Sequence, residues 1–368
     1  MIAVAATQSG QVEELAMLPM TRWFGVTFSD GERNLETERA CIDEIVERVL
    51  QMQAQAAAGQ GRPLARGTHA KGIVAKAKFE VFDVAVGHNP GVAARLAKGI
   101  FAKPGVYPAT VRFANADAHV NSDFKADVRA LSFSVDPASG AQETEIQRQD
   151  FSLQNATVLP LNDAPSFLAT MKFITASNPA KAFVALSHRD KLRVARALAL
   201  DQIQARQEVK PYQQLRYWSN VPYRHGATDF VKQSASPSPS NPARPLQRKN
   251  SDALRDELAR HIDGDAVMSV FDFGLQLLDV ERMTYWGERR DASFWIENAS
   301  VEWKESQAPF FTVARLTLEP KSQISGAFAE KVFFDVTRNA SSDSAPVGSI
   351  NRARWTGEFA SRKARMGV

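Results

Sequence analysis

The stretch AKAKFEVFDV, residues 75–84, alternates small or apolar side chains with charged ones, which is the pattern of a half-buried β-strand. Three more short segments of the same kind follow it before residue 162. They are ATVRFAN (109–115), RALSFSVD (129–136) and FSLQNATVLPL (151–161). Clusters of Gly, Pro, Asn and Asp separate them, as turns do. The sequence therefore predicts a series of strands over residues 74–160.

Helical patterns surround these strands. In residues 35–58, Ile42, Ile45, Val46 and Val49 recur at the spacing of an amphipathic helix. Further helical segments are predicted over residues 164–207, from Asn250 or Ser251 to Gly264 with Asp252 in the first turn, and over the basic end 349–368.

Two more strand-like segments return near the end, AVMSVFDFGLQLLD (266–279) and FFTVARLTLEP (310–320). The polar, proline-rich stretch SASPSPSNPARP (234–245) is predicted to be an exposed loop. Strands first, helices later and two returning strands favour an α+β fold, an antiparallel β-barrel wrapped by helices. We expect an N-terminal arm and helix (1–60) and a barrel domain (61–368).

Composition excludes several classes of protein. The chain has 368 residues, a net charge of +4 and scattered basic residues, so nothing indicates a nucleic-acid partner. No apolar run approaches the roughly 20 residues that a membrane span needs, and the N-terminus is a poor signal peptide. One cysteine, Cys41, excludes internal disulfides. It fits a small buried thiol better than a nucleophile, and we expect a cytoplasmic location.

Two polar residues break the apolar rows of the predicted strands. Asn155 shares a row with Phe151 and Leu153, and Arg129 shares a row with Leu131 and Phe133. A buried polar group costs roughly 1–3 kcal/mol unless it is paired. Each residue therefore has either a structural partner, such as an amide contact or a buried ion pair, or a ligand. Arg112 adds a charge on the opposite face of its strand.

His69 lies in LARGTHAKG, residues 64–72, among small residues that give it little packing role. No histidine is paired at i, i+3 or i, i+4 with another His or Cys, so a zinc site is not indicated. The glycine motifs of nucleotide-binding proteins and the nucleophile elbow of hydrolases do not occur either.

Five segments, taken in order, resemble a known family. They are RGTHAKG (66–72), VRFAN (111–115), DVRALSF (127–133), LQNATVLPLND (153–163) and PVGSINRAR (346–354). Over roughly residues 60–365 the chain resembles the heme catalase superfamily, in particular its short catalase-related members, which include allene oxide synthase-type enzymes that act on fatty-acid hydroperoxides.

The resemblance implies a β-barrel wrapped by helices with heme b buried inside. His69 would stand over the distal face of the heme with Asn155 beside it. A neutral imidazole can accept the proton of a peroxide and return it to the leaving oxygen, and an amide donor steadies the polarised peroxide. Arg66, Arg112 and Arg365 match the arginines that hold the two propionates. Arg129 and Arg354 are expected to belong to the cofactor site as well.

The chain departs from the family pattern at two positions beside His69. Thr68 stands where typical catalases carry valine, which is similar to the allene oxide synthase branch and favours organic hydroperoxides over hydrogen peroxide. Ala114 stands where catalases usually place a serine that hydrogen-bonds the distal histidine. We therefore expect His69 to lose one orienting contact.

The third departure concerns the iron ligand. In the family, the C-terminal helix carries an arginine, the iron-ligating tyrosine four residues later and a propionate arginine seven further on. Here these positions are Arg354, Glu358 and Arg365. A carboxylate is a weaker heme ligand than a phenolate. Three outcomes stay open: Glu358 ligates iron directly or through water, heme binds with an open proximal face, or heme is absent.

Three functions follow as hypotheses. The first is a heme-dependent enzyme that reacts with peroxides, organic or fatty-acid hydroperoxides above hydrogen peroxide, with His69 as acid/base. The second is a heme-free or heme-impaired relative that binds an apolar small molecule. The third is a structural protein whose interior polar groups pair with one another. Family members assemble as dimers or tetramers, so the resemblance also implies a homo-oligomer.

Overall fold

The computed structural model describes residues 35–60, 66, 68–137, 148–337 and 339–366. The predicted N-terminal arm lies outside these residues, apart from the helix that ends it. That helix, α3 (Leu35–Gln60), is present as expected.

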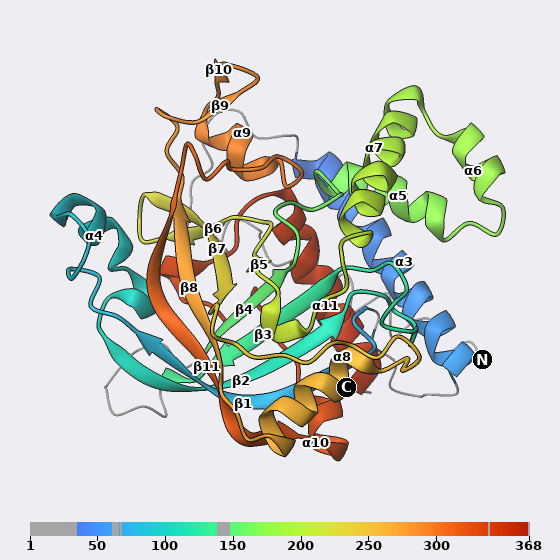
Figure 1. Ribbon diagram of the computed structural model, residues 1–368. Helices are drawn as coiled ribbons and strands as arrows, with labels where there is room; N and C mark the ends of the chain where they lie inside the picture. Colours follow the sequence, from blue (N-terminus) through green and yellow to red (C-terminus); the bar gives the residue numbers. More distant parts are fainter. Residues whose placement is uncertain (1–34, 61–65, 67, 138–147, 338, 367–368) are drawn as a thin grey trace.

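Within the described residues, eight antiparallel strands close into a barrel, as the sequence predicts. Their order around the ring is β5-β4-β3-β2-β1-β11-β8-β7, and β7 pairs with β5 to complete it. The barrel strands are β1 (Gly72–Val81), β2 (Gly105–Asn115), β3 (Arg129–Val135), β4 (Gln149–Gln154), β5 (Tyr217–Trp218), β7 (Asp229–Pro237), β8 (Ser269–Leu277) and β11 (Phe310–Ile324). β6 (Tyr223–His225) extends β7, and β9 (Thr284–Tyr285) and β10 (Glu288–Arg289) form a separate hairpin at the top of Figure 1.

The proline-rich stretch 234–245 is only partly the exposed loop that the sequence predicts. Its first four residues belong to β7, where Ser234 and Ala235 are buried and pair with β8. Pro237 is tolerated there because it is the last residue of the strand, and the next bond to β8 comes from the N–H of Ser238, which donates to Val270 O at 2.9 Å. The loop starts at Ser238.

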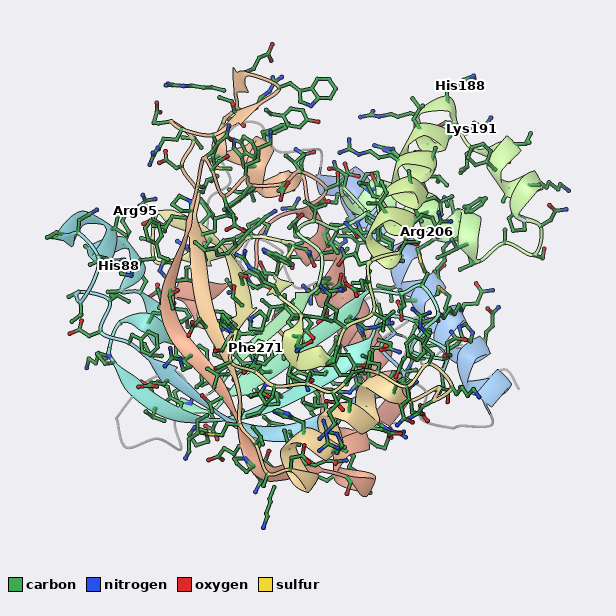
Figure 2. The ribbon with its side chains drawn as sticks, viewed as in Figure 1. His88, Arg95, His188, Lys191, Arg206 and Phe271 are labelled. Carbon is green, nitrogen blue, oxygen red and sulfur yellow. The ribbon has the colours of Figure 1, made fainter. Side chains whose placement is uncertain are left out.

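Side chains fill the inside of the barrel. Phe79, Phe133, Phe151 and Phe273 are fully buried and lie in mutual contact, with ring centroids 4.5–5.8 Å apart. Phe271 lies in the middle of the molecule in Figure 2 and belongs to the same core. Within the described residues these side chains occupy the inside of the ring of strands, so a heme site is expected on the outer face of the barrel. Heme binding itself stays a prediction.

Helices cover the outer faces of the barrel. They are α4 (Pro90–Leu96), α5 (Ala164–Ile174), α6 (Pro179–Ala185), α7 (His188–Ala205), α8 (Ala253–Ala259), α9 (Ala292–Glu297), α10 (Gly326–Lys331) and α11 (Ser349–Met366). Short 3-10 turns lie at Gly99–Phe101, Tyr212–Gln214 and Ser342–Ser344, and a π-helical turn at Arg260–Gly264 continues α8.

A buried ion network ties α3 to α11. The guanidinium of Arg352 on α11 binds Glu38 of α3 at 2.6 Å and Glu297 of α9 at 2.7 Å. All three side chains are buried. The helix that was predicted within the N-terminal segment 1–60 thus shares a buried network with the C-terminal helix.

Candidate functional site

His69 is held at the junction between β1 and the end of β2. Its backbone N–H donates to Ala116 O at 3.1 Å, and the next N–H donates to Asp117 O at 3.1 Å. Its φ angle is 56°, in the left-handed region of backbone conformation that few residues other than glycine adopt. A histidine kept in this conformation by flanking hydrogen bonds suggests a role for the imidazole itself.

The ring of His69 has a defined tautomer. Nδ1 lies 3.0 Å from the backbone carbonyl oxygen of Asn115, and because a carbonyl only accepts, Nδ1 carries the proton. Nε2 then holds a lone pair. Burial, together with the charges of Arg112, Arg66 and Arg354, lowers the pKa of His69 to about 4 against the opposing hydrogen bond to Asn115. The ring is therefore a neutral base near pH 7.

Asn115 replaces the orienting contact that the sequence expectation regarded as lost at Ala114. The carbonyl that accepts from His69 is fixed because the Asn115 side chain is held at both ends. Its Oδ1 accepts from the hydroxyl of Tyr212 at 2.8 Å, and its Nδ2 donates to Asp123 at 2.8 Å. The expectation about His69 was wrong because a backbone carbonyl, which any residue supplies, takes the role of the hydroxyl.

Three arginines, Arg66, Arg112 and Arg365, lie near one another, and the first two act on His69 through their charges. Arg112 projects from β2 away from the barrel core and donates to His69 O at 2.7 Å. Arg66 donates to the carbonyl oxygens of Glu330 and Val332, at 3.1 and 2.8 Å, and Arg365 of α11 donates to Glu330 O at 2.7 Å.

Their charges repel one another. Burial, followed by Arg112 and Arg365, lowers the pKa of Arg66 to about 9, and burial is the main cause that lowers the pKa of Arg112 to about 10. Among the described residues no carboxylate lies within ion-pair distance of these three guanidinium groups; only Glu330 acts on them from farther away. Guanidinium groups gathered without a counter-ion form a binding site for carboxylates or phosphates.

Gly72 makes room for one of these guanidinium groups. A Cβ at this position would lie 2.4 Å from the carbonyl oxygen of Phe113 and 2.8 Å from Nη2 of Arg112. A side chain there would displace Arg112, so the last glycine of RGTHAKG is required by the arginine across from it.

The outer face of β1–β4 beside these residues is built from small side chains. Gly72 pairs with Ala114, which pairs with Ala130, and in the next row Arg112 pairs with Ser132. Their strand neighbours point into the core, so these side chains point outward. The helix α11 lies behind β2–β4 in Figure 1, and within the described residues its main packing partner is α3 rather than a barrel strand. A face of small side chains opposite a helix suits a flat ligand.

On α11, Glu358 is paired with Arg354. The Nε of Arg354 donates to Glu358 Oε1 at 2.8 Å, one turn of helix away. Burial alone would lower the pKa of Arg354, but Glu358 and the nearby hydroxyl of Tyr223 raise it above its ordinary value. Tyr223 comes from β6 and is fully buried. The position that the resemblance assigns to an iron ligand thus carries a carboxylate held in an ion pair.

Asn155 and Arg129 lie together at the same strand end. Asn155 Oδ1 accepts from the backbone N–H of Arg129 at 2.6 Å, and its Nδ2 donates to Gln207 at 3.3 Å. The Arg129 guanidinium donates to Asp123 O at 2.6 Å and lies 3.3 Å from Asp127. Both residues therefore have the structural partners that the sequence left open. The amide of Asn155 keeps one N–H for a ligand. Nη1 of Arg129 makes no hydrogen bond within the described residues, so the place of Arg129 in a cofactor site stays a prediction.

Thr68 and the other candidates occupy varied positions. Thr68 precedes His69 and is exposed. His88 and His188 lie on outlying helical segments in Figure 2. In the described part of the chain, no three His, Cys, Asp or Glu side chains are placed to hold a metal ion.

No helix of that part has the length and apolar character to cross a bilayer.

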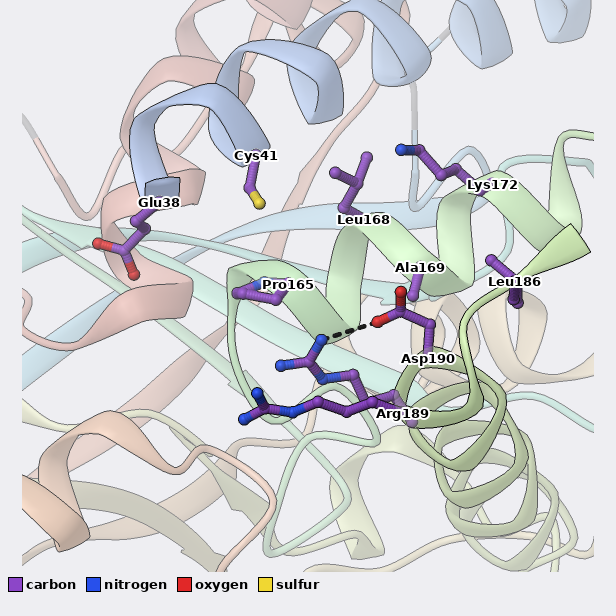
Figure 3. A pocket seen from close by; sticks show the side chains of 10 residues that line it. Glu38, Cys41, Pro165, Leu168, Ala169, Lys172, Leu186, Arg189 and Asp190 are labelled. Carbon is purple, nitrogen blue, oxygen red and sulfur yellow. Dashed lines mark hydrogen bonds and ion pairs between the residues drawn. The ribbon is translucent and has the colours of Figure 1, made fainter. Parts of the chain in front are cut away.

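Cys41 lines a pocket of about 480 Å³ between α3, α5 and α7. Figure 3 shows its thiol facing Pro165 and Leu168, with the ion pair of Arg193 and Asp190 at 2.7 Å across the pocket. Burial raises the pKa of Cys41. A neutral thiol is a poor nucleophile, in agreement with the sequence interpretation.

The sequence matches no protein-family model and no curated protein. Solved structures do match. A fungal catalase superposes with a TM-score of 0.61 at 15% identity over 85% of this chain and 61% of the catalase. A bacterial catalase gives 0.59 at 15% identity over 93% and 63%, and catalase A from Saccharomyces cerevisiae gives 0.58 at 16% identity over 92% and 67%.

The chain has the catalase fold. It spans somewhat less than two thirds of the first two catalases that it matches, 61% and 63% of their length. At this level of identity the likeness concerns the fold, and the chemistry must be argued from the residues of this chain.

The residues of this catalase fold fit heme on two sides. Three guanidinium groups without a counter-ion suit two propionates, and a neutral imidazole with a free Nε2 suits the distal side. At the position of the iron ligand, Glu358 offers a carboxylate that is already paired with Arg354.

Sequence reasoning missed Asn115, Tyr223 and Gly72. The role of Asn115 lies in its backbone, and Tyr223 comes from β6, far from α11 in the sequence, so neither leaves a local pattern. Gly72 did leave one, because it is the glycine that directly follows the His69 segment.

Proposed function

We propose that this protein is a catalase-related heme protein that reacts with peroxides. One observation carries the proposal: a neutral histidine lies beside Arg112 and Arg66, which form with Arg365 a cluster that has no ion-paired carboxylate among the described residues. The catalase fold supports it, with Arg112 on β2, His69 in the loop before β1 and Arg365 on α11.

Arg66, Arg112 and Arg365 would hold the propionates of heme b, and the small side chains of β1–β3 would line one face of the ring. When bound, the heme iron supplies the redox chemistry that cleaves the peroxide O–O bond. Glu358 would lie on the opposite face, held by Arg354.

His69 supplies the acid–base chemistry. Its Nε2 accepts the proton of the hydroperoxide, and the same atom returns the proton to the departing oxygen. The pKa of about 4 keeps the ring unprotonated before the reaction, so that it can accept. The free N–H of Asn155 would donate to the polarised peroxide.

The substrate class that we propose is an organic or fatty-acid hydroperoxide rather than hydrogen peroxide. Thr68 supports this choice, because it places an exposed hydroxyl directly beside the base where the resemblance expects valine. A paired carboxylate at Glu358, in place of a phenolate donor, also argues against the electron-rich iron of rapid hydrogen peroxide turnover.

Absorption spectroscopy and peroxide consumption test the proposal. Purified full-length protein, expressed with ample iron, should show a Soret band and a pyridine hemochrome of heme b and should consume a fatty-acid hydroperoxide. His69→Asn should abolish consumption and keep the Soret band, since asparagine tolerates the φ of 56°. His188→Asn, on the exposed start of α7, is the matched control. Turnover that survives His69→Asn would refute the role of His69.

The second candidate is a heme-free relative that binds an apolar small molecule. The ion pair between Glu358 and Arg354 favours it, because a carboxylate committed to an arginine is a weak iron ligand. Protein that contains stoichiometric heme would exclude this candidate.

A further inference from the structure

A long groove of about 1150 Å³ runs along the outer face of β1 and β2, where α10 and the segment after it cover the sheet. Its apolar lining includes Val106, Pro108, Phe328 and Phe333. Val106 is 54% exposed and Phe328 65% exposed, although both are large apolar side chains. An apolar lining that stays open to water is typical of a binding site.

The charges along the groove are not balanced. Lys78 is paired with Glu319 at 2.7 Å, and Arg148 is paired with Asp150 at 2.8 Å. Two more lysines line the groove, Lys76 and Lys331, and within the described ranges neither has a carboxylate partner. Asp136 lines the groove as well, so four cationic side chains stand against two carboxylates, Asp136 and Glu319, and a surplus of positive charge remains.

Both lysines lie at one end of the groove. On β1, Lys76 projects from the same face as Val74, and Val74 pairs with Arg112 of β2. Lys76 lies two residues further along β1, so it stands roughly 7 Å along the strand from the pair that contains Arg112, here called the arginine row. Lys331 lies between Glu330 and Val332, whose carbonyl oxygens accept from Arg66.

The apolar residues of β2 mark the other end. Pro108 pairs with Lys78 and Val106 pairs with Glu80, so both lie farther along the sheet from the arginine row than Lys76 does. This end also carries the ion pair of Lys78 and Glu319, so the two lysines that have no carboxylate partner among the described residues lie at one end, and apolar side chains with paired charges lie at the other.

We infer that this groove binds a long-chain aliphatic carboxylate. The carboxylate lies between Lys76 and Lys331, and the hydrocarbon chain runs over Val106, Pro108 and Phe328. The site lies outside the arginine cluster, uses none of its guanidinium groups and does not require heme, so it goes beyond the proposed function.

The test uses the full chain and a dansyl-labelled undecanoate as fluorescent probe, displaced by dodecanoate. The double variant Lys76→Ala/Lys331→Ala should weaken binding of the probe by roughly tenfold, since two charge contacts are lost. Val106→Ser/Phe328→Ser should weaken it by a similar factor through the loss of apolar contact. The double variant Lys103→Ala/Lys181→Ala, which removes two exposed lysines elsewhere, should bind as the wild type does.

Two outcomes would overturn the inference: probe binding that is unchanged in Lys76→Ala/Lys331→Ala, or displacement by dodecanol as strong as by dodecanoate. A concentration-dependent dimer that Val106→Ser/Phe328→Ser dissociates would also overturn it, because the groove would then be a contact between copies of this chain. The Soret band of each variant, recorded with hemin, reports separately on the heme site, so failure of the groove and failure of the proposed function are distinguished.

Discussion

The Nδ1 nitrogen of His69 lies 3.0 Å from the carbonyl oxygen of Asn115, and this contact leaves Nε2 as the basic atom of the ring. The contact connects the start of β1 to the end of β2, two elements that the barrel brings together from residues 69 and 115. Because Tyr212 and Asp123 hold the Asn115 side chain, the orientation of the base is built into the fold rather than left to a ligand.

Stability should depend on pH through His69. Burial and neighbouring arginines lower its pKa from 6.5 to about 4 in the folded chain. Between these values the unfolded chain binds a proton at this residue and the folded chain does not, so the free energy of unfolding falls as the pH is lowered through this window. His69→Asn should reduce the loss between about pH 6.5 and about pH 4.5 by roughly 1–2 kcal/mol. Urea denaturation at several pH values measures it.

The control for this experiment is His188→Asn, because His188 is exposed on α7. Its pH dependence should follow that of the wild type. If His69→Asn followed the wild type as well, the imidazole would not be the neutral base that the structure indicates.

The barrel could be predicted because its strands alternate strictly. In RALSFSVD, Leu131, Phe133 and Val135 point into the core, and the residues between them face outward. The same alternation continues weakly into the proline-rich stretch, where Ala235 points inward, but its serines and prolines look like a loop. Only pairing with β8, a contact distant in sequence, shows that β7 extends to Pro237.

The structure brings several of the predicted site residues near one another, and their role in binding a cofactor stays a prediction. Arg112 donates to the carbonyl oxygen of His69, and Arg365 acts on Arg112 through its charge. Arg112 and Arg365 lie on a strand and a helix whose periodicity the sequence shows, whereas His69 lies in the loop before β1. The contacts of Asn155 and Arg129 could not be predicted, since whether a buried amide binds a neighbour or a ligand depends on side chains from other strands. The pairing of Arg354 with Tyr223 is of the same kind.

Hemin affinity should depend on the arginine cluster through the propionates. Arg112→Gln should weaken hemin binding by roughly tenfold or more, because a buried charge-assisted hydrogen bond is lost. The control is Arg95→Gln. Arg95 lies on α4, and the substitution breaks its half-exposed ion pair with Asp229. Absorbance titration with hemin and with its dimethyl ester separates a loss of propionate binding from a general loss of the site. The ester has no propionate charge, so it should bind weakly to the wild type, and its affinity should not fall further in Arg112→Gln.

Gly72→Ala should produce the same defect without removing a charge. The added methyl group meets the Phe113 carbonyl and the Arg112 guanidinium at distances that real Cβ atoms do not reach, so Arg112 must move. We expect weaker hemin binding and a loss of stability of about 1–3 kcal/mol. Equal hemin titrations for the variant and the wild type would show that the placement of Arg112 is not important for the site.

Glu358→Tyr should strengthen heme retention. Position 358 is one helical turn after Arg354, which already holds an anion there, and a phenolate in the same place is a stronger donor to ferric iron. Heme that remains after gel filtration, together with the electron paramagnetic resonance spectrum, measures the change. Glu358→Phe is the matched control, because it supplies the ring without the oxygen and should retain less heme than Glu358→Tyr. Equal retention in the two variants would mean that position 358 does not face the iron.

Arg352→Met should destabilise the whole chain. Arg352 binds Glu38 at 2.6 Å and Glu297 at 2.7 Å, and its loss leaves two buried carboxylates without their cation. Breaking a buried pair in this way costs about 3–5 kcal/mol. The control, Arg289→Met, breaks an exposed pair with Glu281 and should cost less than about 1 kcal/mol. Urea denaturation compares the two.

The same substitution should also weaken hemin binding, because α11 carries Arg354, Glu358 and Arg365 and is held to α3 through Arg352. The effect on hemin should disappear when Arg352→Met is combined with Glu38→Leu and Glu297→Leu, since an apolar trio of similar size can hold the two helices without buried charge. If hemin binding stayed weak in the triple variant although stability recovered, Arg352 would act on the site through its charge and not through the position of α11.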